Sequence, residues 1–117
     1  MRGFRNRDGQ ALIALFRSEA GFPDDRDEAY ASAALPIRQE SVRHVFEGVP
    51  PGSVAVGVLH DESESFDMET NILGMPREGY GASRNPEPRF GPPRFEDAEL
   101  VLAPGQRVRV DIALVYP

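Results

Sequence analysis

Residues 54–61 read VAVGVLHD, and this stretch decides the expected fold class. Valines at every second position fall on one side of a β-strand, and the residues between them are also largely apolar. A strand with two apolar faces is suited to the middle of a sheet, so we expect a central strand here. Gly57 contributes no side chain, which predicts that a neighbouring element approaches the strand closely at that position.

Four other stretches have the alternation, or the short apolar run, that is typical of β-strands. They are QALIALFR at 10–17, SVRHVFEGV at 41–49, AELVLA at 98–103 and RVRVDIALVY at 107–116. Asp8-Gly9 predicts a turn before the first of them. The Pro104-Gly105-Gln106 turn predicts that the last two form a terminal hairpin.

Residues 21–36 have a different pattern, which predicts one short helix. Asp25 and Glu28 stand at the spacing of a capping box near the start of EAYASAAL. The small apolar residues of this stretch recur on one side of a helix. We therefore expect the helix to pack over one end of the fold.

Residues 61–97 have almost no periodicity and are rich in proline and glycine. Aromatic residues are spread through the stretch, whereas disordered segments are poor in them, so we expect a long ordered loop packed on the domain. These aromatic residues are Phe66, Tyr80, Phe90 and Phe95. Strands joined by turns, with a single short helix, predict an all-β fold, an antiparallel β-sandwich that forms one domain over residues 1–117.

The composition excludes several classes of function. The 117 residues carry a formal net charge of -6, which predicts no nucleic-acid partner because the phosphate backbone would be repelled. The absence of cysteine excludes disulfides, thiolate zinc sites and cysteine nucleophiles. The apolar runs are far shorter than the roughly 20 residues of a transmembrane helix, and no signal-peptide pattern follows Met1.

Four stretches carry a resemblance to a known family. They are RGFRNRDGQALIALFRSEAGFP at 2–23, HDE at 60–62, TNILGMPREGYGAS at 70–83 and RFGPPRFEDAEL at 89–100. The chain resembles the uncharacterised secreted bacterial β-sandwich proteins catalogued as domain of unknown function 2141. The resemblance implies an immunoglobulin-like or prealbumin-like sandwich, a periplasmic or extracellular location, and no established activity.

The resemblance also draws attention to the start of the chain. Family members usually have a strand ahead of the Gly-Phe-Arg-Asn element, where this chain has only Met1 and Arg2. A misplaced start codon would explain both this difference and the missing signal peptide, and it is our expectation. If the start is real, the sandwich lacks its first strand and presents a sheet edge open to self-association or to a neighbour's strand.

The acidic stretch HDESESFDMETN at 60–71 suggests a weak Ca²⁺ site. The resemblance implies a loop similar to the oxygen-rich start of an EF-hand, and the candidate ligands in this chain are Asp61, Ser63, Ser65 and Glu69. Phe66 replaces the glycine of the sharp turn, and hydroxyl groups are poorer calcium ligands than amide carbonyls. The alternative is a solvated acidic loop without a metal.

The residues that we expect to bind a ligand are His60, Asp61, Arg77, Tyr80 and Arg89. His60 ends the central strand beside Asp61, where the loops of a sandwich gather, and aromatic residues with arginine suit sugars, peptides or a partner's surface. The alternative is that the aromatic residues only fill the end of the sandwich. His44, on one face with hydrophobic neighbours, is interpreted as a core or interface histidine.

These observations favour a non-enzymatic binding module that holds a small-molecule, glycan or protein ligand through its end loops. An alternative is a small hydrolase or lyase that uses His60 as the base, oriented by Asp61 or Glu62. No serine of the chain lies in a nucleophile-elbow pattern, which weakens this alternative. A third hypothesis is a structural subunit whose sheet is completed by a neighbouring chain.

Overall fold

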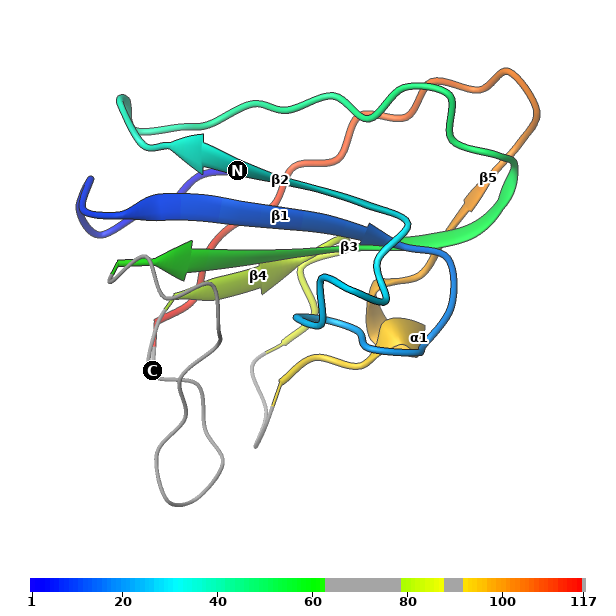
Figure 1. Cartoon of the computed structure of the whole chain (residues 1–117), viewed down its shortest axis with the longest axis horizontal. Coiled ribbons are helices and arrows are strands. Elements are labelled where there is room, and N and C mark those ends of the chain that lie inside the picture. Colours follow the sequence, from blue (N-terminus) through cyan, green and yellow to red (C-terminus); the bar gives the residue numbers. More distant parts are fainter. Residues whose placement is uncertain (63–78, 88–91, 117) are drawn as a thin grey trace.

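The computed structural model describes residues 1–62, 79–87 and 92–116, and Figure 1 shows their arrangement. These parts of the chain form five strands and one short helix. The elements are β1 (Gln10–Phe16), β2 (Ala31–Pro36), β3 (Gly52–Asp61), β4 (Tyr80–Ala82), α1 (Phe95–Ala98) and β5 (Leu100–Leu102).

The strands form one antiparallel sheet in the order β2-β1-β3-β4, and β5 pairs with the first residues of β3. The prediction of a central strand at 54–61 is confirmed, because β3 lies between β1 and β4. The register places Ile13 opposite Val58 and Gly57 opposite Ala82. All residues from Val54 to Asp61 are buried.

Both faces of the sheet are covered, which explains why β3 is apolar on both sides. One face packs against the C-terminal segment, in a cluster of Ile13, Leu15, Val54, Val56, Val58, Ile112 and Leu114. The other face carries Ala55 and Ala82, which pack with Ala98 of α1. There Phe22 makes edge-to-face ring contacts with Phe16 at 5.3 Å and with Phe95 at 5.8 Å.

The close approach predicted at Gly57 is confirmed. A Cβ atom at this position would lie 2.6 Å from the carbonyl oxygen of Pro23, which belongs to the turns between β1 and β2. Only glycine therefore lets these turns rest directly on the centre of the sheet.

The helix predicted within residues 21–36 is wrong. Residues 31–36 form β2, which pairs with β1 from Ala31 opposite Leu15 to Pro36 opposite Gln10. The side chains of β2 alternate between half-buried and exposed, the period of a strand. Alanine-rich sequence favours a helix locally, but pairing with the open edge of β1 overrides that weak preference. The helix of the structure is α1 instead.

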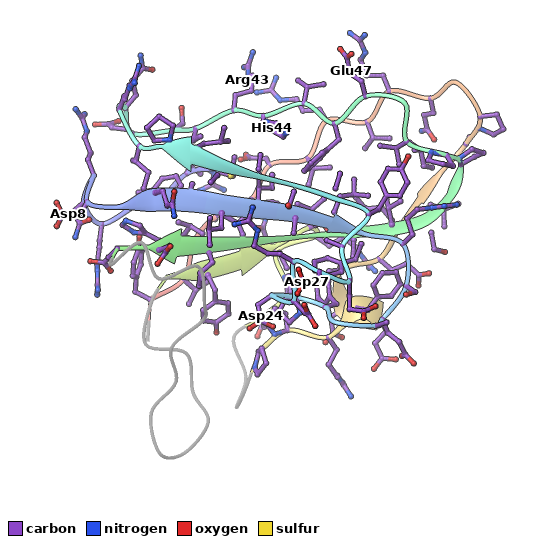
Figure 2. The ribbon with its side chains drawn as sticks, in the orientation of Figure 1. Asp8, Asp24, Asp27, Arg43, His44 and Glu47 are labelled. Carbon is purple, nitrogen blue, oxygen red and sulfur yellow. The ribbon has the colours of Figure 1, made fainter. Side chains whose placement is uncertain are left out.

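The terminal hairpin is also wrong, because β5 pairs with β3 and not with residues 107–116. Residues 41–49 and 107–116 form no regular ladder, and the described structure holds them through isolated bridges at Ser41, Ala113 and Val115. The alternation predicted for 41–49 is nevertheless present. Figure 2 shows Arg43 and Glu47 directed away from the sheet and His44 directed toward it.

The stretch 61–97 is not one continuous loop, since it contains β4 and α1. Tyr80 is buried and Phe95 packs beneath the sheet, in agreement with the expected packing of this stretch, while Phe66 and Phe90 lie outside the described residues. The structure thus shows a five-stranded antiparallel sheet covered by extended segments. A second sheet with immunoglobulin-like connections is not among its described parts. None of the described helices is long and apolar enough to cross a membrane.

Candidate functional site

The candidate site lies at the end of the sheet where β1 begins and β3 ends, at the left of Figure 1. Residues 4–9 run over this end before entering β1, and Figure 2 shows Asp8 at its tip. His60 and Asp61, the last two residues of β3, have no solvent exposure. A buried histidine and a buried carboxylate side by side require hydrogen-bond partners.

Both ring nitrogens of His60 are engaged. Nε2 lies 2.8 Å from the backbone carbonyl oxygen of Asp8, and Nδ1 lies 2.7 Å from the hydroxyl oxygen of Tyr116. Because a carbonyl can only accept, Nε2 carries the proton, and in the neutral ring Nδ1 accepts from the Tyr116 hydroxyl. The ring of Phe4 makes an edge-to-face contact with the His60 ring, and the two ring centroids lie 5.4 Å apart.

Tyr116 links this histidine to the N-terminal segment. Its hydroxyl oxygen accepts a hydrogen bond from the backbone N–H of Arg5 at 2.9 Å, and the Arg5 guanidinium stacks over its ring at 4.8 Å. Burial is the main cause that raises the pKa of Tyr116, so its hydroxyl keeps the proton that it donates to His60. Gly79 makes room for the ring, because a Cβ atom there would overlap it.

Glu62 joins the same network from the residue after β3. Its carboxylate forms an ion pair with the Arg5 guanidinium and accepts a hydrogen bond from Nδ2 of Asn6 at 3.1 Å. Burial opposes ionisation of Glu62, but the hydrogen bonds from Asn6 and Arg5 outweigh it, so the pKa of Glu62 is lowered from its usual 4.5. The ionised carboxylate is therefore the form that the folded state stabilises.

This lowered pKa predicts a pH-dependent effect of Glu62→Gln. The ionised carboxylate contributes stability above pH 4.5, its usual pKa, and this contribution disappears as the pH falls through the lower folded-state pKa. Glu62→Gln should therefore unfold more easily than the unchanged protein in urea at neutral pH, and the difference should vanish in acid. Exposed Glu40→Gln is the control with the same charge change. A difference that persists undiminished in acid would contradict the prediction.

Asp61 is the one predicted calcium ligand within the described residues. It is fully buried, and its Oδ2 atom accepts a hydrogen bond from Nε2 of Gln10 at 3.0 Å. Ser63, Ser65 and Glu69 lie outside the described residues, so the Ca²⁺ site stays a prediction. Among the residues that are described, no three His, Cys, Asp or Glu side chains gather so as to hold a metal ion.

The structure brings three of the predicted ligand-binding residues to this end of the molecule. His60, Asp61 and Tyr80 are all buried there, and the backbone N–H of His60 bonds to the carbonyl of Gly79 at 2.8 Å. The other two candidates, Arg77 and Arg89, lie outside the described residues. Ligand binding by these five residues stays a prediction.

Sequence reasoning missed the partners of His60. The partners are Asp8 and Tyr116, and Arg5, which contacts Tyr116, belongs to the RGFRNRDG stretch that carries the family resemblance. The alternating pattern places Tyr116 only at the end of the strand predicted at 107–116. No local pattern identifies it, because it lies 56 positions from His60 in the chain.

A family model described as "Uncharacterized protein conserved in bacteria (DUF2141)" matches residues 1–110, which is nearly the whole chain. No curated protein and no solved structure matches the sequence.

Proposed function

This chain belongs to DUF2141, a family of uncharacterised bacterial proteins, and we propose that it is a non-enzymatic binding module. The ligand would be held by the loops at the end of the sheet that contains His60 and Glu62. The resemblance that led to this hypothesis also suggests a periplasmic or extracellular location, which we retain as part of the proposal.

The observation that carries this proposal is that His60 is buried and that both of its ring nitrogens are hydrogen-bonded. A general base needs a ring nitrogen that can reach a substrate proton. His60 has no solvent exposure, and its two nitrogens are held by Asp8 and Tyr116. This geometry supports a role in holding the end of the domain together, which leaves recognition to the surrounding loops.

The hydrogen-bond network also holds residues at this end of the sheet in place. Glu62 is tied to Arg5 and Asn6, while Gly79 packs on the Tyr116 ring and bonds to the His60 backbone. Glu62 and Gly79 are therefore both held at this end of the sheet. Backbone that is already held in place loses less conformational entropy when a ligand binds to it.

The exposed side chains of this end suggest a ligand that carries acidic groups. Arg5 and Arg7 are exposed here, although the whole chain is acidic. With Arg77 and Arg89, the other arginine candidates for ligand binding, they would supply the cationic groups of a binding surface. Such a surface suits acidic sugars or peptides, including fragments of the bacterial cell wall.

The test is a thermal-shift screen with Ca²⁺, Mg²⁺, neutral sugars, acidic sugars and cell-wall fragments. We expect an acidic compound to raise the melting temperature, and Arg7→Glu to remove most of this rise. Arg17→Glu, an exposed arginine at the opposite end of β1, makes the same charge change and should leave the rise intact. Equal loss in both variants would show that only net charge matters.

Two arms of the screen test the other parts of the proposal. A rise with Ca²⁺ but not with Mg²⁺, lost in Glu69→Gln, would support the weak calcium site, and the absence of any Ca²⁺ effect would remove it. Proton NMR of the same mixtures tests the enzymatic alternative. Chemical conversion of a compound that is lost in a folded His60→Gln variant would replace the binding module with a hydrolase or lyase.

A further inference from the structure

The sheet is closed along one edge and open along the other. At the β4 edge, Tyr80 exchanges two backbone hydrogen bonds with Val115, at 2.8 and 3.0 Å. At the opposite edge lies β2, the upper strand of the sheet in Figure 1, which pairs with β1 on its inner side. Among the residues that the structure describes, none pairs with the outer side of β2.

The hydrogen bonds of the neighbouring strands determine which backbone groups of β2 face outward. The N–H of His60 bonds toward β4, so the odd-numbered residues of β3 face β1. The register then turns the odd-numbered residues of β1 toward β2, in agreement with the hydrogen bond from the N–H of Tyr30 to the carbonyl of Leu15. By the same reasoning, the N–H and C=O groups of Ser32 and Ala34 point out of the sheet.

This edge carries none of the usual protection against pairing with another strand. Natural edge strands are protected by charged side chains, by bulges or by proline. β2 reads ASAALP, so it has no charged residue, and its only proline is its last residue. Its ladder with β1 runs without a bulge. The outward N–H and C=O groups of β2 are therefore accessible to a second strand.

The residues on the two sides of Ala33 are complementary to one another. Tyr30, whose side chain is 47% exposed, lies three positions before Ala33, and the exposed Pro36 lies three positions after it. The exposed Glu28, which belongs to the acidic turn before β2, lies five positions before Ala33, and the exposed Arg38 lies five positions after it. An antiparallel pairing centred on Ala33 therefore brings an aromatic ring to a proline, and an acidic turn to an arginine.

We propose that the protein forms a symmetric dimer in which β2 pairs with β2 of a second copy. The N–H of Ser32 bonds to the carbonyl of Ala34 of the second copy, and the N–H of that Ala34 bonds to the carbonyl of Ser32. The twofold axis at Ala33 repeats both bonds, so every outward N–H group of the two strands is paired.

The second copy is favoured over a strand of another sequence because this one chain holds both members of each contact. At each end of the dimer, Tyr30 meets Pro36 of the second copy, and Glu28 meets Arg38 of the second copy. The six residues of β2 make a small interface, which predicts a weak dimer with a dissociation constant of about 100 µM. Since β2 contributes no residue to the candidate site, the dimer does not depend on the proposed function.

Sedimentation of the unchanged chain between about 10 µM and about 1 mM tests the dimer. We expect a monomer at the lower concentration and mainly a dimer at the higher one. Amide hydrogen exchange at Ser32 and Ala34 should slow by about fivefold over the same range. A chain that remains monomeric at the higher concentration would refute the dimer and leave the edge bare or available to a strand of another sequence. A dimer without slower exchange at these two amides would place the interface elsewhere and overturn the proposal.

A charge exchange tests whether the partner strand is β2 itself. Arg38→Glu and Glu28→Arg each replace both ion pairs of the dimer with like charges, so each should raise the dissociation constant by about tenfold. The double variant restores opposite charges and should return to the unchanged value. If both single variants weaken the dimer and the double variant does not recover, the pairing about Ala33 is wrong.

Arg107→Glu is the control, because it makes the same charge change at an exposed arginine outside β2 and its adjoining turns. It should leave the dissociation constant unchanged within about twofold. A loss equal to that of Arg38→Glu would show that the dimer responds only to net charge, which would overturn the ion pair between Glu28 and Arg38.

Discussion

Gly9→Ala should lower the free energy of unfolding by about 4 kcal/mol, a large part of the total stability of a small domain. Gly9 has a φ angle of +65°, which costs energy for any residue with a Cβ atom. The added atom would also overlap the carbonyl oxygen of Asp61 and lie 2.7 Å from Cα of Glu62. These are backbone atoms of the last residue of β3 and of the residue that follows it, so no side-chain rotation can relieve the overlap.

Gly105→Ala separates the cost of the positive φ angle from the cost of the steric overlap. Gly105 has a φ angle of +69° but no atom within 4 Å of an added Cβ, so it should lose only about 1 kcal/mol through backbone strain. Urea unfolding followed by far-UV circular dichroism measures both variants, since the chain has no tryptophan for fluorescence. Equal losses at the two positions would mean that residues 4–9 do not pack on the end of β3.

His60→Ala is expected to cost about 3 kcal/mol. The substitution removes a fully buried ring that contacts Phe4 and Tyr116. It also leaves the Asp8 carbonyl and the Tyr116 hydroxyl without the partners that they have in the folded protein. The loss therefore combines a cavity with two broken hydrogen bonds.

His44→Ala provides the matched comparison, because His44 is only half-buried and contacts Phe46 at the edge of its ring. We expect it to cost less than about 1 kcal/mol in the same urea experiment. A loss at His44 equal to that at His60 would contradict the assignment of His60 as the central residue of the network. It would also mean that the contacts of the His60 ring do not hold it in place, so that the ring could act as a base.

The candidate site was predictable only in part. The sequence identified His60 and Asp61 because they end the most strongly patterned strand, and β3 does carry them to the end of the sheet. It could not identify the Arg5 and Tyr116 contacts, which join the two termini of the chain to residue 60. Such contacts depend on how segments pack, and no period or motif in a single segment records them.

The same distinction applies to the strands. VAVGVLHD and QALIALF were predicted correctly because a stretch that is apolar on both faces can be buried only in the interior of a sheet. ASAALP was predicted as helix because its alanine-rich sequence and the capping-box spacing before it favour a helix locally. Its conformation was decided by the open edge of β1.

The sequence by itself therefore determined that this is a β-rich protein with β3 at its centre, a close approach at Gly57 and no cysteine chemistry. These properties follow from residue types and short-range periodicity. Only the tertiary structure decided that β5 pairs with β3, that His60 is enclosed by hydrogen bonds, and that two extended segments flank the amino terminus. The physical reason is that hydrogen-bond partners and burial are set by long-range packing, which residues adjacent in sequence do not specify.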